Sequence, residues 1–136
     1  MQKTTQKTLV GPEAIAEDLQ RRAIESSVTL FLVSIKQLLQ ALTEWSHRKV
    51  DESHVSDVYV ESINHFHASV MAFAVLDIDT SDLESVPDDL RNVLEECLSE
   101  NPSVPALMLY LPTVKGIITN VLELLRRKQK LYRRRR

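Results

Sequence analysis

Apolar residues spaced alternately three and four apart dominate one long segment of this chain. In the stretch IESSVTLFLVSIKQLLQALTEWS the spacing 3,4,3,4,3 joins Val28, Phe31, Ile35, Leu38, Leu42 and Trp45. This is a heptad seam, in which one stripe of a helix faces another helix. A chain with such a seam must bury it against a second helix, either its own or one from another chain.

The same helical periodicity recurs further along. It predicts a first helix over about residues 13–46, kinked near Ser26-Ser27, and a second over about residues 53–76. Asp51 or Ser53 can cap the second helix, because a short side-chain oxygen can accept from the free N–H groups of the first turn.

Two more helices are expected in the second half of the chain. Ser85 begins one of them, with Pro87 early and Asp88 placed as in a capping box. A short helical turn is expected over 104–110. Pro112 then opens the last helix, because proline is tolerated in a first helical turn.

Glycine is scarce, since the chain has only Gly11 and Gly116. That leaves little material for hairpin turns or phosphate loops and favours helices. We therefore predict an all-α fold, an elongated bundle of long antiparallel helices. Residues 13–132 form the helical domain, 1–12 a disordered lead and 133–136 a basic tail. Helices of about 30 Å or more exceed a compact globule of this size, which predicts a coiled-coil-like homodimer or pairing with a partner's helix.

The seam and the corresponding face of the last helix are the predicted interface with a partner or second copy. Both faces consist of large aliphatic or aromatic side chains at helical spacing. The candidates are Val28, Phe31, Ile35, Leu38, Leu42, Trp45, Val114, Ile118, Val121 and Leu125.

Charge is distributed unevenly. Residues 1–125 hold nine basic and nineteen acidic groups, a net charge of −10, whereas residues 126–136 hold eight basic groups and no acidic one. The basic patch comprises Arg126, Arg127, Lys128, Lys130, Arg133, Arg134, Arg135 and Arg136. Cations at a helix C-terminus complement the helix dipole, which is our first interpretation. The alternative is binding to an anionic membrane, microtubule or nucleic-acid surface, although the acidic body disfavours nucleic acid.

No grouping of residues predicts catalysis, a small-molecule substrate, a metal or another cofactor. Cys97 is the one cysteine and is interpreted as a buried thiol. His65 and His67 are two apart on a helix, so their rings point to opposite faces and do not form a metal pair. The loop from Asp77 to Asp88 lacks the glycine of a calcium loop. No long uninterrupted apolar run indicates a transmembrane helix, and the N-terminus lacks the apolar region of a secretory signal.

Four segments together resemble the N-terminal domain of the fungal actin-interacting bud-site-selection proteins, polarity factors of the polarisome. They are SSVTLFLVSIKQLLQALTEWS, VSDVYV with Asn64 and Phe66 after it, VPDDLRNVLEECL, and YLPTVKGIITNVLELLRRKQ. They occur in the family's order over about residues 26–129, and VSDVYV and VPDDLRNVLE are the more specific.

The resemblance implies a non-enzymatic scaffold or adaptor that helps localise and assemble formin-linked, actin-regulating complexes. Implied partners are polarisome scaffold proteins, the actin and formin machinery, and proteins at microtubule ends. The implied location is the cytoplasm and cytoskeleton, at the cell cortex where growth is polarised. In this family the actin- and formin-binding core lies C-terminal to the domain that this chain resembles.

Overall fold

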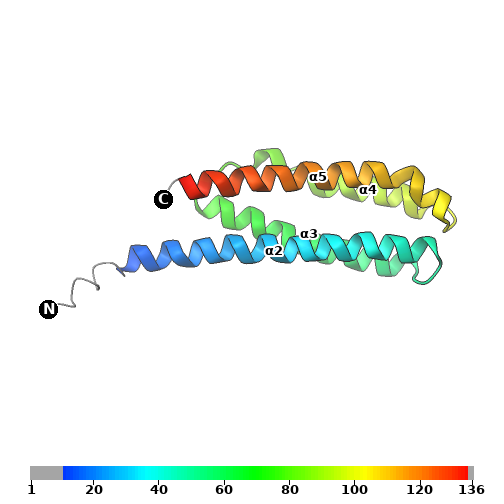
Figure 1. The fold of residues 1–136 in the computed structure, drawn as a ribbon, viewed down its shortest axis with the longest axis horizontal. Coiled ribbons are helices and arrows are strands. Elements are labelled where there is room, and N and C mark those ends of the chain that lie inside the picture. The colour runs from blue at the N-terminus through cyan, green and yellow to red at the C-terminus, as the bar shows by residue number, and fades with distance from the viewer. Residues whose placement is uncertain (1–10, 135–136) are drawn as a thin grey trace.

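The structure is a computed structural model that describes residues 11–134. Within that range it contains four α-helices, one short 3-10 helix and no strand, which confirms the predicted all-α bundle (Figure 1). The elements are α2 (Pro12–Ser46), α3 (Glu52–Val75), η1 (Ser81–Leu83), α4 (Val86–Leu98) and α5 (Val104–Arg134). Most of the predicted lead, residues 1–10, and the last two residues of the predicted tail lie outside the described range.

The helices form an elongated up-and-down bundle in which each helix runs antiparallel to the one before it (Figure 1). α2 packs along α3, and α4 packs along α5. The two hairpins meet chiefly where α2 lies against α5, whereas α3 and α4 approach each other closely at few positions. The bundle is one chain, so the homodimer stays a prediction.

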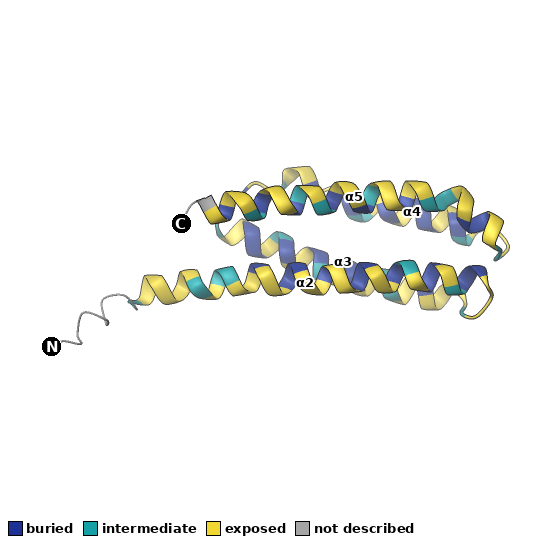
Figure 2. Ribbon diagram, viewed as in Figure 1, coloured by how far each residue is buried: buried dark blue, intermediate teal, exposed yellow. Residues whose placement is uncertain are grey.

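The apolar stripes of the four helices meet in one core along the bundle axis (Figure 2). Phe31 of α2 and Phe66 of α3 form its aromatic centre, with ring centroids 5.7 Å apart and the rings tilted by 56°. Tilted aromatic pairs of this kind are favourable beyond the area that they bury. The heptad spacing of the sequence thus produces the contact between the first two helices.

Two of the helix ends are fixed by local hydrogen bonds. Asp51 caps α3, its side chain accepting from the N–H of His54 at 3.0 Å, so Asp51 rather than Ser53 is the N-cap. At the end of α2, the N–H of Arg48 donates to the Trp45 carbonyl at 2.9 Å, and the next N–H in the chain donates to the Glu44 carbonyl at 2.8 Å. This is a Schellman motif, and it puts Arg48 at a left-handed φ of 61°.

The end of α3 repeats this motif at Asp77. The N–H of Asp77 donates to the Ala74 carbonyl at 2.9 Å, and the N–H of Ile78 donates to the Phe73 carbonyl at 3.1 Å. Asp77 has a φ of 63°, a conformation that glycine adopts without strain. Ile78 is buried, so the motif also turns an apolar side chain back into the core.

Asp77→Gly should stabilise the protein. Glycine removes the strain of the left-handed conformation, and its extra freedom in the unfolded chain offsets part of that gain. We expect the free energy of unfolding to rise by about 0.5–1 kcal/mol in urea denaturation followed by circular dichroism. Ala74→Gly is the control, since a glycine inside the helix should cost about 1 kcal/mol. A loss of stability in Asp77→Gly would contradict this account of the turn.

The predicted start of the last helix was wrong, whereas Ser85 does begin the third helix but without the predicted capping box. Pro112 does not open the last helix, because α5 begins at Val104 and continues through the proline. Because proline has no N–H, the carbonyl of Met108, four residues earlier, loses its helical donor. Both Met108 and Pro112 are exposed, so water can donate to that carbonyl. Figure 1 shows α5 bending near this end. Ser85 precedes α4 but makes no capping hydrogen bond, because its backbone is already helical after the turn at η1.

Two helices are long and apolar enough to cross a membrane, judged by length and composition alone. The windows concerned lie in α2 and α5 and have mean hydropathies of 1.2 and 1.3. In the bundle, 44% of the α2 window and 28% of the α5 window are buried within the chain.

Candidate interaction surface

The residues predicted to form an interface between chains lie inside this one. The structure buries all ten of them, and the most exposed, Val28 and Ile118, are each 6% exposed. α2 and α5 present these side chains to each other and to α3 and α4, so the chain covers its own seams. A second chain is not needed to bury them, and any partner surface has to be sought among exposed residues.

The basic patch is divided by the fold. Arg126, Arg127, Lys130 and Arg133 are exposed on the last turns of α5. Lys128 is 6% exposed and belongs to the core side of the helix. Its Nζ lies 2.7 Å from Oδ1 of Asp82 and 2.9 Å from Oδ2, which ties α5 to η1. The predicted patch also includes Arg134, whose side chain is not described, and Arg135 and Arg136 beyond the described residues.

Asp82→Asn should destabilise the bundle. It would leave the largely buried ammonium of Lys128 without a negative partner, and burying an unpaired charge is costly. Because Asp82 is 44% exposed, water screens part of the loss, and we expect the free energy of unfolding to fall by about 1–2 kcal/mol. Glu84→Gln, a similar change at an exposed neighbour, should cost under about 0.5 kcal/mol in the same urea denaturation. Equal effects in both variants would contradict a structural role for the pair.

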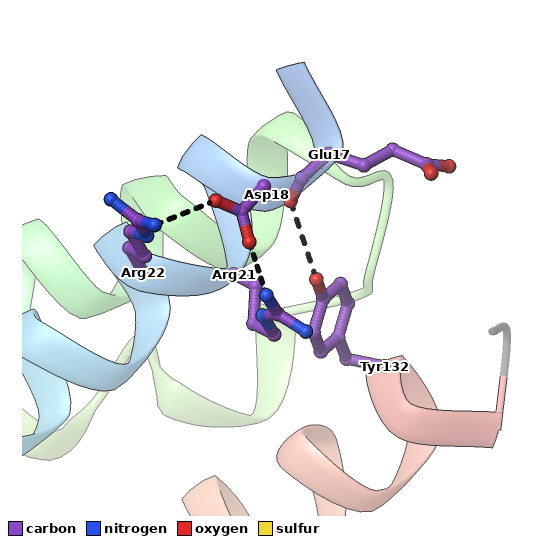
Figure 3. A network of polar contacts seen from close by, with 5 residues as sticks. All are labelled: Glu17, Asp18, Arg21, Arg22 and Tyr132. Carbon is purple, nitrogen blue, oxygen red and sulfur yellow. Dashed lines mark hydrogen bonds and ion pairs between the residues drawn. The ribbon is translucent and has the colours of Figure 1, made fainter. Parts of the chain in front are cut away.

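The last turns of α5 are also attached to α2. Tyr132 is buried, and its hydroxyl donates to the backbone carbonyl of Glu17 at 3.4 Å (Figure 3). Beside this contact, Asp18 accepts from Arg21 and pairs with Arg22 at 3.1 Å. The C-terminal turns of the helix therefore have structural contacts on one side and exposed cations on the other.

Local environment shifts the pKa values of Cys97 and Asp79 in opposite directions. Cys97 is buried as predicted, and this burial raises the pKa of its thiol to about 11, with Glu100 adding to the effect. A thiol of that kind stays protonated and is a poor nucleophile at neutral pH. Asp79 accepts from the N–H and hydroxyl of Ser81, which lowers the pKa of its carboxyl group. Residues 11–134 contain no cluster of potential metal ligands.

Two apolar hollows lie between α3 and the segment from η1 to α4, and together we call them the α3–α4 groove. One hollow, of about 240 Å³, is lined by Val55, Ser56, Tyr59 and Val60 of α3 and by Arg91, Leu94, Glu95 and Leu98 of α4. A second, of about 250 Å³, lies between α3 and the turn before α4 and is lined by Phe66, His67, Val70, Thr80, Leu83, Glu84 and Pro87. The hydroxyl of Tyr59, in the lining of the first hollow, donates to the carbonyl of Pro87, in the lining of the second, at 2.6 Å.

Charged groups of α4 surround the first hollow. Burial raises the pKa of the Tyr59 hydroxyl; the cation of Arg91 opposes the shift, and the carboxylates of Asp88 and Glu95 add to it. Arg91 is itself paired with Asp88 at 3.1 Å. The α4 side of the groove is therefore acidic, whereas the α3 side is neutral.

The main apolar seam of each helix does not reveal this groove. The available signal was an excess of apolar residues on α3. Val60, Met71 and Val75 lie outside the seam of that helix and are 54%, 63% and 61% exposed. Large apolar residues that gather on one exposed face are typical of interaction sites.

The fold and its surface define a helical-bundle domain whose described residues offer grooves and charged faces. The sequence narrows this class to one family, because the family model of the Aip3p/Bud6 N-terminal domain matches residues 25–133. The chain therefore belongs to this family, as the resemblance predicted. A search of the curated proteins found no match, and neither did a search of the solved structures.

Proposed function

We propose that this domain is a non-enzymatic scaffold module of a cell-polarity factor. Through helix–helix contacts it localises and assembles formin-linked, actin-regulating polarisome complexes. The observation that carries the proposal is the family match over residues 25–133, which coincides with a bundle that buries its own core. The family is one of actin-associated polarity scaffolds.

The proposed partners are polarisome scaffold proteins, the actin and formin machinery, and proteins of microtubule ends. The proposed site of action is the cell cortex at points of polarised growth. Exposed apolar side chains on a bundle that buries its own seams support contacts with other proteins.

The test uses a polarised fungal cell that lacks its own member of the family. The cell receives the full-length family protein in one of two forms, one that contains this domain and one that lacks residues 12–134. Both forms carry a fluorescent tag. Recruitment of a tagged formin to growth sites and the alignment of actin cables are then measured. Loss of both in the deleted form, at equal protein level, is the expected result. Normal recruitment without the domain would overturn the proposal.

Homodimerisation is part of the proposal and has a separate test. Light scattering of the chain at low and high salt gives its mass in solution. A dimer held by apolar contacts should persist in high salt, because screening weakens only charge pairs. A monomer in all conditions would remove the homodimer and leave heterotypic contacts.

A second candidate function is binding to an anionic surface through the end of α5. Arg126, Lys130 and Arg133 are exposed and have no ion pair within residues 11–134, which favours it. Replacing these three by glutamine keeps the Lys128 and Tyr132 contacts intact. Co-sedimentation with anionic vesicles or microtubules should then fall steeply with salt for the original chain and be weak for the variant. Equal binding by both chains would exclude this surface.

A further inference from the structure

The α3–α4 groove continues along most of α3. Its two hollows are lined by α3 residues from Val55 to Val70, which at 1.5 Å per residue corresponds to about 22 Å of helix. The groove offers two separate apolar depressions, and the Tyr59–Pro87 hydrogen bond joins a residue that lines the first to a residue that lines the second. That length suits a partner helix of about four turns with an apolar anchor for each hollow.

Beside the groove, α3 carries an exposed stripe that reads Val60, Asn64, His67, Met71 and Val75 at spacings of four, three, four and four. Val60 lines the first hollow and His67 the second. All five positions fall on one face of the helix. Three of the five are large apolar residues that are more than half exposed. His67 lies against the Phe66 ring, with centroids 5.9 Å apart, so the stripe is continuous with the second hollow.

The α4 bank is acidic. Glu84, Asp88 and Glu95 are exposed along it, and the cation there, Arg91, is already paired with Asp88. The imbalance extends to the whole segment: residues 51–100 contain thirteen acidic residues and one basic residue. A ligand that covers this groove therefore meets apolar side chains of α3 on one side and, on the other, the carboxylates of Glu84 and Glu95, which have no ion pair within residues 11–134.

We propose that the α3–α4 groove binds an amphipathic helix of a partner protein whose apolar stripe is flanked on one side by lysine or arginine. The apolar stripe fits the two hollows and the exposed face of α3, and the cationic flank meets the α4 carboxylates. The inference rests on the proposed scaffold function and gives that scaffold a binding surface and a partner chemistry.

The cationic turns of α5 in a second copy do not form such a helix. The cations of α5 are exposed, but the apolar side chains between them, Leu125 and Tyr132, are buried against the rest of the bundle. The one large exposed apolar residue in those turns is Leu131, at 48%. A basic face without an apolar stripe would leave the hollows empty, so the occupant is a different protein.

The test uses a fluorescent probe peptide of about 18 residues, with leucines at i, i+4, i+7 and i+11 and lysines along one flank. Its affinity for residues 1–136 is measured by anisotropy, beside a scrambled peptide of the same composition. Saturable binding of the amphipathic peptide, with the scrambled one at least about tenfold weaker, is expected.

Two groove variants are compared with two matched controls. Val60→Glu and Glu95→Lys alter the apolar and acidic banks. Val33→Glu, at a 47% exposed position of α2, and Glu96→Lys, the next residue of α4, make the same changes outside the groove. The groove variants should weaken binding by about tenfold or more, and the controls by less than about twofold. Circular dichroism and thermal unfolding verify that all four fold.

Other outcomes would overturn the proposal. Equal loss in Glu95→Lys and Glu96→Lys would mean that the peptide responds only to net charge, and equal loss in Val60→Glu and Val33→Glu would mean that it does not bind this groove. A homodimer that dissociates in Val60→Glu would make a second copy the occupant.

The same variants in the fungal cell separate this inference from the proposed function. If the cell requires the domain but the groove variants function normally, the proposed binding groove is wrong and the proposed scaffold function is retained. If the cell does not require the domain but the groove binds the peptide, the proposed scaffold function is wrong and the proposed binding groove is retained.

Discussion

Leu42→Ala should lower the free energy of unfolding by about 2–5 kcal/mol. Leu42 is 0% exposed, as is Leu38, and both lie where α2 meets the other helices. Removing three carbon atoms there forfeits their burial and leaves a cavity that the surrounding helices fill only in part. Guanidinium denaturation followed by far-ultraviolet circular dichroism measures the loss, and Leu38→Ala should behave alike.

Leu30→Ala is the matched control, because Leu30 belongs to the same helix but is 47% exposed. It should change stability by less than about 0.5 kcal/mol. Similar effects at Leu30 and Leu42 would mean that the stripe at three-and-four spacing is not the face that α2 buries.

Phe66→Ala should cost about 3–5 kcal/mol, the usual range for a fully buried phenylalanine. The ring is 1% exposed and packs against Phe31, so its removal opens the contact between α2 and α3 at its centre. The loss is measured by the same denaturation series.

A double-mutant cycle with Phe31 isolates the contact between the two rings. The tilted geometry predicts that the double variant loses about 0.5–1.5 kcal/mol less than the sum of the two single losses, because each single variant already removes the contact. Strictly additive effects would show that the rings contribute only through the area that they bury.

The ends of a helix were predictable from sequence to within a residue or two where a single apolar stripe runs the length of that helix. The predicted start at 13 and end at 46 of the first helix compare with Pro12 and Ser46 in the structure. The start of α5 was not predictable in this way. Whether a proline begins a helix or lies inside it depends on whether the carbonyl four residues earlier can reach water, and that is known only once the bundle is assembled.

The candidate surface was harder to derive than the fold. Periodicity shows that a stripe such as Leu38–Trp45 must be covered, but not whether the cover comes from the same chain. The answer depends on how the four helices are arranged in the bundle, and the spacing of apolar residues within one helix carries no information about that arrangement. Lys128 illustrates the same limit, because its sequence neighbours are exposed cations while its own partner, Asp82, lies 46 residues away.

The single cysteine gives this bundle a built-in reporter of its internal motion. Cys97 is 1% exposed on the core face of α4, and the chain has no other thiol. A thiol reagent can reach it only when α4 opens away from the core, so the labelling rate at high reagent concentration measures how often that happens. Ligands that hold α4 in place would slow labelling, and their binding could be followed without any added probe on the protein.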